Sequence, residues 1–287
     1  MVKLVSVATH SDGYLPWLQK SCDRHNVKLN ILGWNQKWQG FVWRFSLMID
    51  YLKSVDPNEL VCFIDAYDVI LLRSLDDIEE YYNNIVKLTG KKIIIASENA
   101  HNPYIKQMSE FIFDKCKNIQ INAGTYMGRA KDILEVLTDM NSKNKPSDDD
   151  QVVYTDYCNN HPDIFYIDHD KIFFLTVEDT FNDVMQNFDI KIENNGSKYP
   201  IVKYMESRPF FIHGNGNTLL NSVIEKLGYT ITEDENKKIN GSHTKIIINK
   251  VKYYVKHLLN IYWYHIIIIC ILLFIIYRKY YRTYNLI

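Results

Sequence analysis

Short apolar runs rich in β-branched residues alternate with amphipathic stretches over the first two thirds of the chain. Runs of the first kind predict buried strands, and the stretches between them predict helices. The predicted strands are Lys3–Ala8, Lys28–Gly33, Leu60–Ile64, Lys92–Ser97, Gln120–Met127, Ile164–Ile167 and Pro209–His213. The predicted helices are Leu15–His25, Phe45–Val55, Ile78–Leu88, Tyr104–Cys116, Ala130–Asn141, Asp149–Cys158 and Thr218–Leu227. This alternation predicts an α/β, Rossmann-like fold, with a mainly parallel sheet covered by helices on both faces.

The two ends of the chain differ in character. The N-terminal stretch Met1–His10 turns polar too soon for a secretory signal and instead predicts the first strand. The stretch Ile261–Tyr277 is apolar apart from His265, and it has tyrosine, tryptophan, lysine and arginine residues at its ends. At ~1.5 Å per residue its length comes close to a hydrocarbon core of ~30 Å, and its aromatic ends fit the membrane interface. We expect a C-terminal membrane-anchor helix here, and the alternative is a buried or surface amphipathic helix.

The chain is expected to divide into four parts. Residues 1–229 would form the globular domain, 230–258 a polar juxtamembrane linker, 259–279 the transmembrane anchor and 280–287 a short tail. Basic residues on both sides of the anchor leave its orientation open, and a globular domain in the cytoplasm is the simplest arrangement. Two N-glycosylation signals, at Asn195 and Asn240, would matter only with the domain in a lumen.

Composition narrows the classes of partner. A hydrophobic fraction of 47% over 287 residues is ample for a core. The net charge of -1 and the pI of about 6.7 give no reason to expect a nucleic acid as the main ligand. The cysteines are odd in number and lack the spacing of a zinc site or a disulfide framework, so we expect reduced, mostly buried thiols. They are Cys22, Cys62, Cys116, Cys158 and Cys270. Nothing in the composition indicates an oligomeric state.

Two carboxylates, Asp65 and Asp68, follow the apolar run Val61–Ile64 and precede another apolar stretch. Charges at the end of a buried strand usually face a cleft, and hard oxygen ligands suit a divalent cation that carries phosphates. Aspartates in this position also cap turns and begin helices. This run alone leaves both interpretations open.

A second strand ends in the loop His213-Gly214-Asn215-Gly216. Histidine offers a neutral nitrogen ligand, and the glycines would let backbone N–H groups approach a phosphate. By itself the loop also fits a turn with a surface histidine. Together with the aspartates it predicts one metal site of Asp65, Asp68 and His213. Mixed oxygen and nitrogen ligands suit Mn²⁺, with Mg²⁺ as the alternative.

Three acids, Asp148–Asp150, stand at the start of a predicted helix. Acids there stabilise the helix dipole, and this suffices to explain them. The functional alternative puts Asp149 and Asp150 into the cleft, where carboxylates can hold hydroxyl groups or assist proton transfer. The segment Asn122-Ala123-Gly124 likewise exposes polar backbone at a strand start or forms an ordinary loop.

Several short blocks occur together in one order over about residues 1–230. They are Val7-Ala8-Thr9, Leu32-Gly33 with Trp38, Phe63–Val69, Ala96-Ser97-Glu98, Asn122-Ala123-Gly124, Asp148–Gln151 with Tyr154-Thr155, Ile167-Asp168-His169 and His213–Gly216. In these blocks the chain resembles the glycosyltransferase domain of the procollagen lysyl hydroxylase and glycosyltransferase family. That domain has the GT-A nucleotide-sugar fold.

The resemblance implies roles for the donor site. Asp65, Asp68 and His213 would hold Mn²⁺ against the diphosphate of a UDP-sugar. Trp38 and Tyr67 match the positions that sandwich the uracil ring, a role that suits flat aromatic faces. Core packing is the alternative for both aromatic residues.

The resemblance also implies the remaining site residues. Asp149 and Asp150 match the acidic pair whose side chains face the transferred sugar, and we expect them to be catalytic. Further donor-binding residues are expected in the matching blocks, namely Asn122, Gly214, Asn215 and Gly216.

The chain departs from the family pattern in two places. A glycine-rich segment that carries a lysine in the family is shortened here to Gln39–Arg44, with Val42 at the lysine position. Arg44 is expected to replace that lysine as a phosphate contact. The family's Cys-Trp-Pro is His101-Asn102-Pro103 here, so the acceptor side of the cleft is expected to differ. The anchor is expected where the family has its hydroxylase part.

The main prediction is a metal-dependent, membrane-anchored glycosyltransferase that moves glucose or galactose from a UDP-sugar to a hydroxyl acceptor. The family implies a protein acceptor, either hydroxylysine or its galactosylated form. A second hypothesis is a non-catalytic membrane-bound scaffold or nucleotide-sugar-binding module. A third takes His161-Pro162-Asp163 with His213 as the iron site of an oxygenase. The alternating helices and strands disfavour the all-β scaffold expected for that site.

Overall fold

The computed structural model describes residues 2–98, 115–178, 184–192, 198–203, 206–215 and 218–241, with short stretches between 244 and 277. The chain forms two compact units, Met1–Ser242 and His243–Ile287. The first unit extends beyond the expected boundary at residue 229, because Ile231 and Ile239 pack into one of its apolar clusters.

Helices and strands of the first unit follow the predicted alternation. The helices are α1 (Leu15–Arg24), α2 (Trp43–Lys53), α3 (Ile78–Thr89), α5 (Ala130–Lys143), α6 (Asp150–Asn160) and α7 (Asn221–Lys226). The strands are β1 (Lys3–Val7), β2 (Leu29–Leu32), β3 (Leu60–Ile64), β4 (Val69–Leu71), β5 (Ile93–Ser97), β6 (Ile121–Arg129), β7 (Phe165–Asp168), β8 (Phe174–Val177), β9 (Phe188–Ile192), β10 (Lys198–Val202) and β11 (Phe211–Gly214). All seven predicted strands are present, and six of the predicted helices are confirmed. The helix predicted at Tyr104–Cys116 falls almost entirely outside the described residues.

The central sheet has the strand order β2-β1-β3-β6-β5-β7. Its described strands run parallel except β6, which is antiparallel to both neighbours. The predicted mainly parallel α/β fold is therefore confirmed. Because β6 runs in the opposite direction, it begins at the edge where the parallel strands end, and Thr125 pairs with Ile64. Polar residues at the start of β6 thus lie beside those that follow β3.

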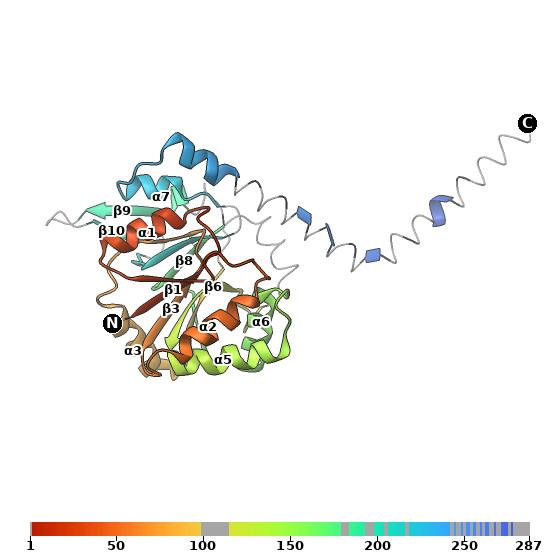
Figure 1. Ribbon diagram of the computed structural model, residues 1–287, viewed down its shortest axis with the longest axis horizontal. Coiled ribbons are helices and arrows are strands. Elements are labelled where there is room, and N and C mark those ends of the chain that lie inside the picture. Colours follow the sequence, from red (N-terminus) through yellow and green to blue (C-terminus); the bar gives the residue numbers. More distant parts are fainter. Residues whose placement is uncertain are drawn as a thin grey trace, which may run out of the picture. The chain divides into compact units, whose positions relative to one another are not determined.

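Side chains of β3 alternate between two apolar clusters, one on each face of the sheet. Val61 and Phe63 pack with α2, α5 and α6, whereas Leu60, Cys62 and Ile64 pack with α1 and α3. Figure 1 shows α2, α5 and α6 together on one side of the sheet and α1 on the other. This strand is buried along its whole length, so the first charges after it mark the point where the chain leaves the core.

A smaller sheet, β4-β11-β8, packs on the α1 and α3 side. Sequence reasoning gave no strand at β4, β8, β9 or β10, because runs of three to five residues carry little periodic signal. β4 matters for the site: β11 pairs with it antiparallel, with His213 opposite Val69. This pairing places His213 next to the loop that contains Asp68, because Val69 directly follows Asp68.

A disulfide joins Cys116 to Cys158, so the expectation of reduced thiols was wrong for these two residues. They are separated by 42 positions and meet because the turn at Cys116–Ile119 lies against α6. Sequence spacing carries no trace of such a contact. Among the described residues, Cys22 and Cys62 are free and buried, as expected.

The C-terminal prediction stays open. The described residues include no helix long and apolar enough to cross a membrane. Much of the predicted anchor 259–279, and the whole tail 280–287, lie outside the described residues. The glycosylation signal at Asn195 and the variant segment His101-Asn102-Pro103 also lie outside them.

The disulfide gives a stability prediction. Closing a loop of 42 residues lowers the entropy of the unfolded chain, so the double variant C116S/C158S should lose up to about 4 kcal/mol of unfolding free energy. Urea denaturation under non-reducing conditions measures this. Wild type in dithiothreitol should approach the variant, and the variant should not respond to dithiothreitol. Equal stability of variant and oxidised wild type would contradict the bond.

Candidate functional site

The predicted ligands Asp65, Asp68 and His213 converge at the carboxyl end of β3, and their ligand atoms all lie within 4.8 Å of one another. Backbone hydrogen bonds hold them there. The N–H of Asp65 donates to the carbonyl of Gly124 at 2.8 Å, and the N–H of Gly214 donates to the carbonyl of Asp68 at 2.8 Å. The sheet register therefore assembles the group, which no single stretch of sequence contains.

This group fits a divalent cation. Nε2 of His213 lies 3.3 Å from Oδ1 of Asp68 and 3.9 Å from Oδ2 of Asp65. Oδ1 of Asp68 is buried and makes no well-aligned hydrogen bond among the described residues, so the imidazole of His213 is its charged neighbour there. Two carboxylates and one imidazole suit Mn²⁺. In the described part of the chain this is the one such group, so the alternative site at His161 and Asp163 gains no support.

Burial and charge shift the protonation of the group. Burial raises the pKa of Asp65 to about 6, although the Arg44 guanidinium acts in the opposite direction. Burial lowers the pKa of His213, but the carboxylates of Asp68 and Asp65 outweigh it and raise that pKa to about 9. The imidazole is thus held protonated at neutral pH, and a metal that binds Nε2 must displace this proton.

Arg44 lies in the first turn of α2, is buried, and donates to two carboxylates, those of Asp65 and Asp150. Its predicted contact with a phosphate stays a prediction, because the guanidinium here faces protein groups. Val42, at the position of the family's lysine, is fully buried in the apolar cluster and presents no charge to the site.

The two predicted catalytic acids at the start of α6 behave differently. Asp149 is the N-cap and accepts the N–H of Gln151 at 2.9 Å, so helix capping accounts for one of its oxygens. Burial, followed by the charge of Asp150, raises the pKa of Asp149. Asp150 is buried and turns inward to Arg44. The pair therefore places one carboxylate at the rim and one in the interior.

Gln151 attaches the start of α6 to the start of β6. Its side-chain carbonyl accepts the N–H of Ala123 at 2.8 Å, and its amide nitrogen donates to the carbonyl of Ile121. Sequence reasoning gave this residue no role. The sequence feature that could have indicated a role is its position directly after Asp149 and Asp150, in the segment Asp148–Gln151 that resembles the family.

Glu98, at the end of β5, is a second residue that received no role. Its Oε1 accepts from the side-chain amides of Asn122 at 2.6 Å and Asn215 at 2.7 Å. Its Oε2 is buried without a hydrogen-bond partner among the described residues. Two of the predicted donor-binding residues are therefore brought together by this carboxylate.

The predicted phosphate loop differs from expectation at Gly214 and Asn215. Their N–H groups are bonded to the carbonyls of Asp68 and Val177, at 2.8 Å and 2.9 Å, so they do not face a phosphate. Gly214 is needed for packing instead, since a Cβ there would lie 2.8 Å from the carbonyl oxygen of Thr218. Gly216 lies outside the described residues.

The predicted uracil-binding residues lie after β2 and β3. Trp38 is 40% exposed and makes edge contacts with Phe41 and Trp43 at ring separations of 5.5 Å and 5.7 Å. Tyr67 is partly buried, and its hydroxyl accepts the N–H of Thr9 at 3.0 Å. Trp38 is thus not a core residue, and Tyr67 is fixed beside the end of β1. Stacking on uracil stays a prediction for both.

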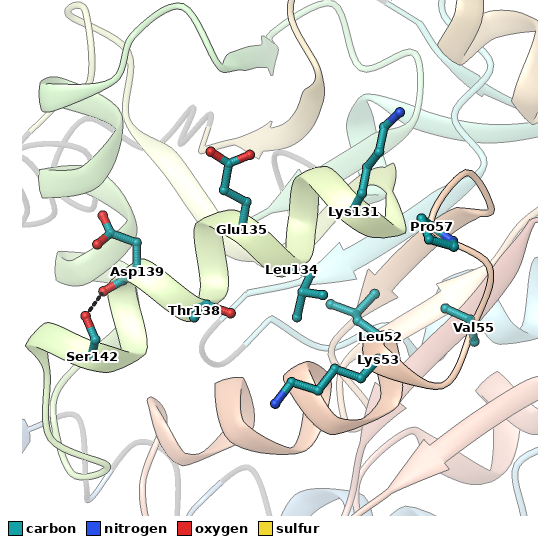
Figure 2. Close-up of a pocket in the computed structure, with 10 residues that line it drawn as sticks. All are labelled: Leu52, Lys53, Val55, Pro57, Lys131, Leu134, Glu135, Thr138, Asp139 and Ser142. Atoms are coloured by element: carbon teal, nitrogen blue, oxygen red, sulfur yellow. Dashed lines mark hydrogen bonds between the residues drawn. The ribbon is translucent and has the colours of Figure 1, made fainter.

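A separate groove of about 680 Å³ lies between α2 and α5. Figure 2 shows Leu52 and Leu134 next to each other between the two helices. Leu52 belongs to the last turn of α2, whereas Arg44 belongs to the first. The groove therefore lies away from the carboxylate and histidine group, and it shares no lining residue with it.

Comparison with known proteins decides the family. The model of the PLOD GT domain matches residues 1–257. The chain belongs to this family. It is therefore a glycosyltransferase domain, as the sequence predicted.

Relatives of this PLOD GT domain occur in a virus and in animals. It is 27% identical over 262 residues to the uncharacterized protein R699 of Acanthamoeba polyphaga mimivirus, covering 86% of this chain and 53% of that protein. It is 25% identical to the procollagen-lysine,2-oxoglutarate 5-dioxygenase of Drosophila melanogaster, covering 75% of this chain and 30% of that protein. The chain thus spans about half of the first relative and about a third of the second.

One solved structure with similarity to this chain is a glycosyltransferase involved in glycosylation of the major capsid of PBCV-1. It aligns with a TM-score of 0.46 at 12% identity, covering 79% of this chain and 98% of the other.

Gly124 gives a test of the site geometry. A Cβ at this position would lie 2.5 Å from Oδ2 of Asp65 and 2.6 Å from Cε1 of His213. The variant Gly124→Ala should therefore weaken Mn²⁺ binding by roughly tenfold or more, as disturbed metal ligands do. Isothermal titration of the folded protein with Mn²⁺ measures this.

Gly128→Ala is the matched control on the same strand. Its Cβ would lie 3.0 Å from the carbonyl oxygen of Lys92, so it perturbs β6 away from the site. This control should retain the wild-type Mn²⁺ affinity. Equal affinity of both variants would show that Gly124 does not adjoin the metal ligands.

Proposed function

We propose that the chain is a metal-dependent glycosyltransferase of GT-A type, which moves a hexose, glucose or galactose, from a UDP-sugar to a hydroxyl acceptor. The observation that carries this proposal is the convergence of Asp65, Asp68 and His213 at one edge of the sheet, in a domain of the PLOD GT family. In open α/β sheets, ligands bind beyond the carboxyl ends of the strands, where these residues lie.

Asp65, Asp68 and His213 would hold Mn²⁺, with Mg²⁺ as the alternative. When bound, such an ion neutralises the charge that develops on a departing diphosphate. Contacts within the protein hold Asp65 in position: its side chain accepts from Arg44, and its backbone N–H donates to the carbonyl of Gly124. A site fixed in this way avoids reorganisation when the leaving group departs.

We assign the other predicted donor-site roles to residues near the same edge of the sheet. Trp38 offers a half-exposed aromatic face and Tyr67 a restrained ring for the uracil base. Asp149 and Asp150 would face the transferred sugar, with the rim carboxylate of Asp149 better placed to accept a sugar hydroxyl. Asn122 and Asn215, joined through Glu98, would line the donor side.

The proposed acceptor is a protein-linked hydroxyl group, hydroxylysine or its galactosylated form. Support comes from a relative in Caenorhabditis elegans named multifunctional procollagen lysine hydroxylase and glycosyltransferase, which is 22% identical over 232 residues. Transfer to hydroxylysine peptides with and without galactose would separate the two acceptors.

We propose that the C-terminal segment attaches the protein to a membrane. We further propose that the globular domain lies in an oxidising compartment, and not in the cytoplasm as the simplest arrangement would have it. The Cys116–Cys158 disulfide supports this, because such bonds persist in oxidising compartments and are rare in the cytosol. Glycan occupancy at Asn240 in expressing cells tests it, since an unmodified site throughout would favour the cytoplasm.

The catalytic proposal is tested by donor hydrolysis and sugar transfer from UDP-glucose and UDP-galactose in the presence of Mn²⁺. The double variant D65A/D68A should lose at least about 100-fold in turnover, because metal-assisted stabilisation of a leaving group is worth several kcal/mol. The double variant D23A/D50A removes the same charge from exposed helix positions and should stay within about twofold of wild type. Equal turnover in D65A/D68A and wild type would contradict the assignment.

A further inference from the structure

Arg44 connects two carboxylates that lie far apart in the sequence. One terminal nitrogen, Nη1, donates to Oδ1 of Asp65, and the other, Nη2, donates to Oδ2 of Asp150. The side chains are 9%, 23% and 8% exposed for Arg44, Asp65 and Asp150. Solvent therefore screens these contacts little, and a change at one carboxylate is felt at the other.

The contact with Arg44 also selects which oxygen of Asp65 faces the metal ligands. Oδ1 is occupied by the guanidinium, so Oδ2 is the oxygen turned toward Nε2 of His213, at 3.9 Å. A planar guanidinium with two donors in a fixed fork can hold two carboxylates in this way, whereas an ammonium group acts as a point charge.

The surroundings keep the guanidinium in place. The rings of Phe41 and Phe63 each lie 5.5 Å from its central carbon. Asp150 is restrained in turn, because its neighbour Gln151 attaches α6 to the start of β6. The bridge therefore joins three elements of the fold, α2, the end of β3 and the start of α6.

We propose that Arg44 is a positioning residue that couples the strength of the cation site to Asp150, which is not one of the predicted metal ligands. This rests on the proposed metal site. A single positive charge is shared between two carboxylates, and Asp65 keeps enough negative charge to attract a cation. Without the charge of Asp150, the guanidinium is left to Asp65 alone, and the attraction of Asp65 for a cation falls.

The test is titration of the full chain with Mn²⁺ by calorimetry, without donor or acceptor. Asp150→Asn should bind Mn²⁺ about tenfold more weakly than wild type, the lower end of the effect of groups that support metal ligands. Asp156→Asn is the matched control, because it removes the same charge from an exposed position of the same helix, α6. It should stay within about twofold of wild type.

Repeating the Asp150→Asn measurement in an Arg44→Lys variant tests whether Arg44 transmits the effect of Asp150 to the cation site. In Arg44→Lys, which keeps the charge but loses the fork, Mn²⁺ affinity should fall, and adding Asp150→Asn should have less than about a threefold further effect. A thermal melt without metal confirms that each variant is folded. The lysine ammonium keeps a positive charge near the buried carboxylates but lacks the two separate nitrogens that hold one carboxylate each, so this background breaks the bridge without leaving the site uncompensated.

The outcomes separate the two proposals. If wild type binds neither Mn²⁺ nor Mg²⁺, the metal site and the coupling both fall. If wild type binds Mn²⁺ but Asp150→Asn and Asp156→Asn behave alike, the coupling alone is wrong. A full tenfold effect of Asp150→Asn in the Arg44→Lys background would show that Asp150 acts on the site without the Arg44 bridge.

Discussion

The structure depends on the compensation of negative charge at the point where β3 leaves the core. Asp65 follows a strand that is buried over its whole length, and Asp68 and Asp150 lie near it. Grouped carboxylates of this kind are costly unless cations balance them. The protein supplies one fixed cation, the Arg44 guanidinium, and one imidazole that the neighbouring acids hold protonated against the opposing effect of burial. A divalent ion would complete the balance at the side of Asp65 that Arg44 does not occupy.

This requirement explains the arrangement of the elements around it. β6 runs against its neighbours and so delivers Asn122 and Gly124 to the edge where β3 ends. The short strand β4 returns the chain from Asp68 and gives β11 a partner, which brings in His213. The first turns of α2 and α6 lie next to each other at this site, with Arg44 in the first turn of α2 and Asp150 in the first turn of α6. Gly124 lacks a side chain because no space remains for one.

The sequence predicts features that are encoded within one short stretch of residues, and it does not predict contacts between distant segments. The strands and helices could be predicted, and the ligands Asp65, Asp68 and His213 stand at the ends of clear apolar runs. The approach of His213 to the aspartates, however, depends on the antiparallel pairing of β11 with β4, a strand that the sequence did not predict. The contacts of Glu98 and Gln151, and the disulfide from Cys116 to Cys158, depend on pairing between distant segments, which no periodicity records. Arg44 was expected at the donor, but its partners could not be known before α2 and α6 were placed. The N–H groups of Gly214 and Asn215 are not available to a phosphate, because they already donate to the carbonyls of Asp68 and Val177, contacts between segments that are distant in the sequence.

Asp65, Asp68 and His213 are proposed to form one cation site at the donor edge of this domain. Crystals grown with MnCl₂ and UDP, measured at the manganese absorption edge, test it most directly. We expect one anomalous peak within coordination distance of the two carboxylates and Nε2 of His213, with Arg44 still bridging Asp65 and Asp150. A peak elsewhere, or UDP bound with no anomalous signal beside these side chains, would contradict it.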